Sequence, residues 1–174
     1  MLVDVLHFSF TVSDLDRSVD WYVGVVGLEL VNRQRQDNDY TRTLVGMADA
    51  VLEVARLKIP SRSPGSSDHL LELVHYVAPA GARVPLPTNS PGVAHLAFLV
   101  DDIHARYQWM TELNVEFRGR PVQITAGSNE GGWACYFTGP DGETLELLEP
   151  APDRRRAMVT AIAADQARLE KTDA

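Results

Sequence analysis

The chain has 174 residues, of which 45% are hydrophobic, and a formal net charge of −8. This length and apolar content predict one domain with a sizeable core, or two small modules that share one. The negative charge disfavours nucleic acid and anionic membranes as partners, and no apolar run reaches the roughly 20 residues of a membrane span. The single cysteine, Cys135, excludes an intrachain disulfide and a cysteine-based zinc site. Together with the lack of a signal-peptide pattern, it predicts a cytoplasmic protein.

The predicted strands of the first half cover about residues 4–12, 28–35, 40–44, 50–59 and 69–77. After the first strand, Ser13 is expected to cap a helix that runs to about Val23, with Asp16 as its capping-box carboxylate. Gly24 and Gly27 are expected to end this helix. The proline-rich stretch that follows, about residues 79–92, predicts an irregular linker.

The second half repeats this plan. Its predicted strands cover about residues 93–100, one or two segments of 115–124, 133–137 and 143–149. Asp101 or Asp102 is expected to cap a helix that runs to about Leu113, with Asn114 as a left-handed stop. The glycine-rich loop 126–132 is a candidate lid. A terminal amphipathic helix of about 153–171 needs a partner surface for its apolar side chains, and a dimer contact is one explanation.

Two patterns in the chain are written twice. Residues 7–15 read HFSFTVSDL and recur as HLAFLVDDI at 95–103. Each half later carries a second match, LELV at 71–74 and LELL at 145–148. Two copies of roughly 75 residues are too few and too long for a solenoid, so they predict two halves of one domain.

The repeated patterns place two histidines and two glutamates opposite large apolar side chains. His7 and His95 alternate with phenylalanine and leucine, and Glu72 and Glu146 each lie between two leucines. One such residue alone is more often a partly exposed polar group. Four inside the concavity of a sheet are costly unless they are paired or bind a metal. Two imidazoles and two carboxylates suit Zn, Fe, Ni, Co or Mn, so we predict that these four residues bind one divalent metal ion.

Further motifs resemble a known family. They read TVSDLDRS at 11–18, GLEL at 27–30, GVAH at 92–95 and YFTGPDGETLEL at 136–147. This set is similar to the vicinal oxygen chelate superfamily, which includes glyoxalase I, methylmalonyl-CoA epimerase, extradiol dioxygenases, and fosfomycin- and bleomycin-resistance proteins. The resemblance covers about residues 5–150. Gly139 replaces the usual aspartate before Pro-Asp-Gly, a departure that affects the turn and not the expected ligands.

The resemblance implies an α+β fold for residues 1–174 as a single glyoxalase-like domain. Two βαβββ modules, at about 4–78 and 93–150, would pair into a curved mixed β-sheet cup with helices outside, followed by the terminal helix. Whether the modules pair within one chain or swap between two chains of a homodimer stays open.

The resemblance also implies proton-transfer chemistry on a small molecule with adjacent oxygens, as in an isomerase, epimerase or lyase. The metal would polarise both oxygens, lower the pKa of a neighbouring C–H and stabilise the enediolate. Glu146 or Glu72 could then move the proton. Glu53 resembles an acidic residue of the epimerase branch that acts as a base, and it is the third candidate catalytic residue.

Three alternatives remain open at this stage. An extradiol dioxygenase would hold Fe(II) with two histidines and one glutamate, so one carboxylate would not be a ligand. A thiol transferase like the fosfomycin-resistance proteins would use three protein ligands from paired chains. A non-enzymatic antibiotic-binding protein would lack the metal set.

Overall fold

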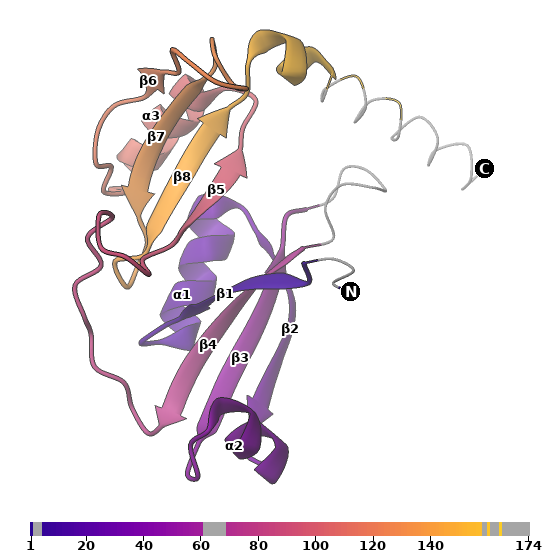
Figure 1. The fold of residues 1–174 in the computed structure, drawn as a ribbon, viewed down its shortest axis with the longest axis vertical. Coiled ribbons are helices and arrows are strands. Elements are labelled where there is room, and N and C mark those ends of the chain that lie inside the picture. The colour runs from indigo at the N-terminus through magenta and orange to yellow at the C-terminus, as the bar shows by residue number, and fades with distance from the viewer. Residues whose placement is uncertain (2–4, 61–68, 158–159, 161–163, 165–174) are drawn as a thin grey trace. The chain divides into compact units, whose positions relative to one another are not determined.

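A computed structural model of the chain describes residues 1, 5–60, 69–157, 160 and 164. The described residues form two compact units, one up to Pro85 and one from Leu86 onward, and each is presented by itself. Each unit contains a four-stranded mixed sheet, which confirms the predicted α+β class (Figure 1). Within the described ranges, no helix combines the length and the apolar character needed to cross a membrane.

The elements of unit 1 are β1 (His7–Thr11), α1 (Leu15–Trp21), the π-helical turn η1 (Tyr22–Val26), β2 (Glu29–Gln36), α2 (Asp39–Val45), β3 (Val51–Lys58) and β4 (Leu70–Ala78). The strands lie in the order β1-β4-β3-β2. The β1–β4 pair is parallel and the other two pairs are antiparallel. Strand β4, which carries the second duplicated motif of this half, is therefore an interior strand of the sheet.

Helix α1 begins one residue later than predicted. Asp14, and not Ser13, is its N-cap, and the Asp14 carboxylate accepts a 3.0 Å hydrogen bond from the backbone N–H of Arg17. Asp16 does not act as a capping-box carboxylate, because its side chain pairs with Arg33 of β2. The helical segment continues through η1 and ends at Gly27, which has a φ of 84°. This left-handed stop was predicted.

The strand predicted for residues 40–44 is wrong, because these residues lie in α2. The Asn38 side chain caps the helix by accepting a 2.9 Å hydrogen bond from the N–H of Thr41. Gly46 ends it with a φ of 70°. Both helix signals flank the segment. An alternation over five residues is too short to outweigh them.

The elements of unit 2 are β5 (His95–Leu99), α3 (Ile103–Glu112), β6 (Val122–Gln123), β7 (Trp133–Thr138) and β8 (Thr144–Glu149). Their order, β5-β8-β7-β6, repeats that of unit 1, with a parallel β5–β8 pair. Residues 152–157 are helical. The apolar residues predicted to give the terminal helix its partner surface, Met158, Ile162 and Leu169, lie outside the described residues.

The ends of α3 follow the prediction. Asp102 is the N-cap and accepts a 2.9 Å hydrogen bond from the N–H of Ala105. Asn114 adopts the expected left-handed conformation, with a φ of 60°. The helix ends at Glu112, one residue before the predicted end, and Leu113 is 44% exposed.

In each unit the buried leucines of the central strand lie on one face of the sheet. Leu71 and Leu73 of β4 and Leu145 and Leu147 of β8 are at most 5% exposed. In unit 2 this is the face covered by α3, because Glu149, which shares their parity, accepts a 2.9 Å hydrogen bond from the N–H of Ile103. The even-numbered residues of these central strands therefore point to the other face.

Candidate metal centre

In unit 1, His7 and Glu72 come from neighbouring strands. Ser9 of β1 lies opposite Glu72 of β4, so His7 is two residues from the position beside Glu72 and on the same face. His7 Nε2 lies 3.7 Å from Glu72 Oε2. The Glu72 side chain is only 14% exposed, whereas that of His7 is 36% exposed. The pair is thus a largely buried carboxylate beside a more open imidazole.

The other oxygen of Glu72 is held by an arginine. Arg56 of β3 lies directly opposite Glu72 in the antiparallel pairing. Its Nε donates a 2.9 Å hydrogen bond to Glu72 Oε1. The guanidinium therefore engages one carboxylate oxygen, and the other faces His7.

Unit 2 repeats the pair without the arginine. His95 Nε2 lies 3.2 Å from Glu146 Oε2, and the two side chains are 48% and 12% exposed. The residue opposite Glu146 is Tyr136 of β7, whose ring centroid lies 5.3 Å from that of His95. Partial burial and the negative charge of Glu146 raise the pKa of the Tyr136 phenol. The hydroxyl therefore keeps its proton to a higher pH than an ordinary tyrosine.

Each pair places a histidine nitrogen beside a carboxylate oxygen, the two donor types of the predicted metal site. Metal–nitrogen and metal–oxygen bonds of about 2.0–2.2 Å place adjacent ligand atoms about 3–3.5 Å apart. The 3.2 Å separation in unit 2 lies within this range, and the 3.7 Å separation in unit 1 is slightly longer. Among the described residues, no group of three or more His, Cys, Asp or Glu side chains is gathered closely enough to hold a metal. Each unit by itself thus supplies two of the four predicted ligands.

Glu53 lies apart from Glu72. It is opposite His75, three positions from the Arg56–Glu72 pair, so its side chain leaves the sheet from the opposite face. There Glu53 Oε1 accepts a 2.9 Å hydrogen bond from Arg35 Nη1. The structure therefore does not bring this third candidate catalytic residue together with the glutamate of its own unit.

Two further histidines lie outside the predicted ligand set. His75 is half-buried in the central strand β4, with Nδ1 3.2 Å from the carbonyl oxygen of Val12. His104 is exposed, and its ring contacts that of Trp133 at a centroid distance of 4.7 Å.

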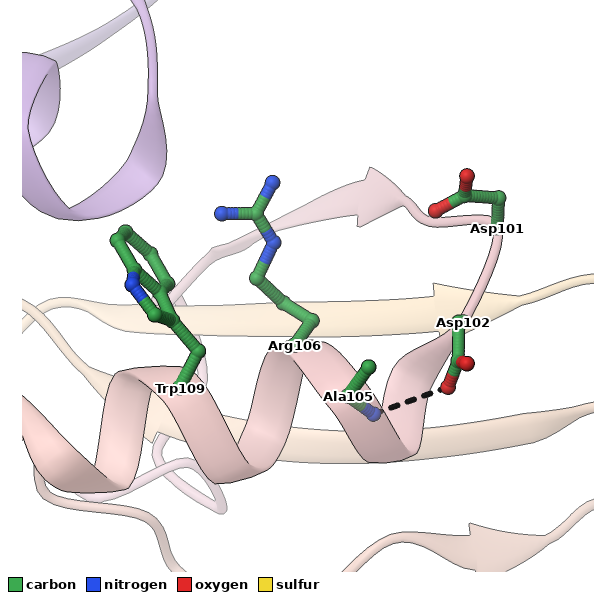
Figure 2. Close-up of a pocket in the computed structure, with 5 residues that line it drawn as sticks. All are labelled: Asp101, Asp102, Ala105, Arg106 and Trp109. Atoms are coloured by element: carbon green, nitrogen blue, oxygen red, sulfur yellow. Dashed lines mark hydrogen bonds between the residues drawn. The ribbon is translucent and has the colours of Figure 1, made fainter.

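An open pocket of about 240 Å³ lies along α3 and is lined by Asp101, Asp102, Ala105, Arg106 and Trp109. Arg106 and Trp109 project from the same side of the helix (Figure 2), and the guanidinium carbon lies 5.0 Å from the indole centroid. Glu146 points from the sheet face opposite α3, so this pocket is separate from the His95–Glu146 pair.

Sequence similarity identifies the family of the chain. Residues 4–147 match the Glyoxalase/Bleomycin resistance protein/Dioxygenase superfamily. The chain belongs to this superfamily. It is 37% identical over 151 residues to a 2-epi-5-epi-valiolone epimerase from Actinomyces sp., covering 84% of this chain and 79% of that protein. It is 27% identical over 150 residues to a lactoylglutathione lyase from Haemophilus influenzae, covering 84% and 93% of the two chains.

The fold has a close match among solved structures. A glyoxalase family protein from Bacillus cereus superposes with a TM-score of 0.74 over 87% of this chain and 96% of the other, at 22% identity. At that identity the likeness concerns the fold. The two relatives described above are named as an epimerase and a lyase, in agreement with the predicted class of chemistry.

Sequence reasoning did not single out Tyr136 as a neighbour of Glu146. A signal was present, because the predicted tight turn at 139–142 joins β7 to β8 and limits which residue of β7 can lie opposite Glu146. Arg56 was not singled out as a neighbour of Glu72 either. Its pairing with Glu72 had no comparable signal, because the connection between β3 and β4 is long.

Proposed function

We propose that this protein is a metal-dependent epimerase that acts on a small molecule with adjacent oxygens. The observation that carries the proposal is the duplicated His–Glu pair, His7 with Glu72 and His95 with Glu146, on the sheet faces opposite the buried leucines of the central strands. The 37% identity to an epimerase favours this reaction over the lyase reaction of the more distant relatives. The metal would require one pair from each half, taken from one chain or from two chains of a homodimer.

A bound divalent ion would supply Lewis acidity toward the two substrate oxygens. The histidines are the more exposed members of the two pairs and would orient the bound ion. Glu146 would take the proton from the carbon next to the substrate carbonyl, and the electron pair of the broken C–H bond would move to the carbonyl oxygen. A proton from water delivered to the other face of that carbon would restore the carbonyl and invert the configuration, and Glu146 would release its own proton to the solvent.

The first test is the metal content of the purified protein, measured by mass spectrometry of the metal and compared with variants. We expect His7→Ala, Glu72→Ala, His95→Ala and Glu146→Ala each to lose stoichiometric metal. His104→Ala and Glu53→Gln serve as matched controls that should keep it, because neither side chain belongs to the pairs. Metal that stays in both His7→Ala and Glu72→Ala would contradict the four-ligand site.

The reaction is tested with the metal-loaded protein in D2O. The substrate is 2-epi-5-epi-valiolone, the compound in the name of the relative. Proton NMR should show loss of its exchanging C–H signal as deuterium enters, together with the signals of an epimeric product. Production of lactoylglutathione would instead assign the lyase reaction. Oxygen uptake with catechols after anaerobic Fe(II) loading would assign a dioxygenase. Tight binding of an antibiotic by a metal-free protein would assign the resistance function.

A further inference from the structure

The two glutamates of the duplicated pairs have different neighbours across the sheet. In the β3–β4 pairing the residue opposite Glu72 is Arg56, and in the equivalent β7–β8 pairing the residue opposite Glu146 is Tyr136. Arg56 Nε lies 2.9 Å from Glu72 Oε1. Among the described residues, Glu146 has no arginine or lysine within ion-pair distance, and its charged contact is with His95.

We propose that Arg56 is a positioning residue that holds Glu72 as a fixed, one-oxygen metal ligand. The inference rests on the proposed function, because it concerns one of the ligands of that site.

The geometry supports a fixed Glu72. A hydrogen bond between a charged donor and a charged acceptor is shorter and about twice as strong as a neutral one, so the guanidinium restrains the carboxylate plane. With Oε1 engaged by Arg56, Oε2 remains on the side of His7, at 3.7 Å from Nε2. The arginine thereby selects which oxygen would face the ion.

Burial strengthens this restraint. The side chains of Glu72 and Arg56 are 14% and 35% exposed, so water screens their attraction less than at an open surface. A largely buried carboxylate that lost its cation would be left poorly compensated. Hydrogen-bond partners of ligands also support metal affinity, and their removal typically costs about 10–100-fold.

A purely electrostatic role for Arg56 predicts the opposite effect. A positive charge beside a divalent ion repels it, so removal of Arg56 would then tighten metal binding. The sign of the change in affinity therefore distinguishes a positioning residue from a nearby charge.

The experiment measures Co²⁺ affinity by calorimetry and the Co²⁺ absorption spectrum for the full-length protein and three variants. We expect Arg56→Gln to weaken binding by about 10-fold or more and to change the spectrum, because Glu72 is no longer restrained. Arg56→Lys, which keeps the charge but not the Nε–H, should fall between Arg56→Gln and the parent protein.

The matched control is Arg118→Gln. Arg118 Nη2 donates a 3.0 Å hydrogen bond to Thr144, which shares a sheet face with Glu146, and in the described ranges it forms no ion pair with either glutamate. This variant removes one positive charge and should leave the affinity and the spectrum unchanged. Circular dichroism of every variant establishes that it is folded.

The outcomes separate the two proposals. A parent protein that binds no Co²⁺ contradicts the proposed function. Binding by the parent protein together with equal or tighter binding by Arg56→Gln overturns the role of Arg56 alone. Equal losses in Arg56→Gln and Arg118→Gln would also overturn it, because the effect would then be one of net charge. If Arg56→Gln does not fold, parent-like binding and spectrum in Arg56→Lys would be enough to reject the role.

Discussion

The two units share one plan and differ in the surroundings of their glutamates. Both have a parallel pair at one edge, a central strand that ends the repeat, and a His–Glu pair across that parallel contact. In unit 1 the glutamate is paired with Arg56, whereas in unit 2 it faces Tyr136. The two units thus share a His–Glu pair and differ in the charge beside the glutamate. The two carboxylates therefore have different surroundings.

The units also differ away from the pairs. Unit 1 places the helix α2 between β2 and β3, capped by Asn38 and ended by Gly46. In unit 2 the chain between β6 and β7 forms turns that include Gly127 and Gly131, both with a φ of 85°. The predicted lid falls in this second segment and remains a prediction.

The largest expected effect concerns Glu146, which has no arginine or lysine partner in the described part of the chain. Glu146→Gln removes the group that would move the proton, so deuterium exchange into the substrate should fall by about 10²–10⁴-fold. Glu53→Gln is the matched control and should stay within about twofold of the parent protein, because Glu53 leaves the sheet from the face opposite Glu72. An equal loss in both variants would restore Glu53 as a candidate base.

The second effect concerns the reactivity of the buried Cys135 thiol in unit 2. Burial, and to a smaller extent the charge of Glu146, raises the pKa of the Cys135 thiol from 9.0 to about 11. A raised pKa means less thiolate, so at pH 8 about one molecule in 1000 is reactive instead of about one in ten. Alkylation by iodoacetamide, followed by mass spectrometry, should therefore be about 100-fold slower than for an exposed cysteine.

The same measurement separates the two causes of this shift. Glu146→Gln removes the charge and leaves the burial, so the pKa of Cys135 should fall only part of the way toward 9.0 and alkylation at pH 8 should become faster. A rate unchanged by Glu146→Gln would mean that the charge of Glu146 does not reach the thiol.

The smallest effect tests the equivalence of the two units. Asp14 and Asp102 cap α1 and α3 with hydrogen bonds of 3.0 and 2.9 Å. Asp14→Ala and Asp102→Ala should each lower the free energy of unfolding by about 1 kcal/mol, measured by urea denaturation. A loss in only one variant would mean that the two helices do not contribute equally to stability.

Local patterns carried much of the fold. Alternation located β1, β5 and β8 to within a few residues and placed His7, Glu72, His95 and Glu146 opposite the apolar side chains, because side-chain direction in a strand depends only on parity. The same reasoning mistook α2 for a strand, where capping residues outweighed a short alternation. It also chose Ser13 as the cap of α1, because two adjacent residues can both accept the hydrogen bond.

What the sequence by itself determined is the duplicated plan, the four candidate ligands and the family, since these depend on residue type and spacing. Only the tertiary structure decided which side chains lie beside them. The pairing of Arg56 with Glu72, and the position of Glu53 on the other face, depend on strand register. Register across a long connection is set by the packing of whole strands and not by any short motif.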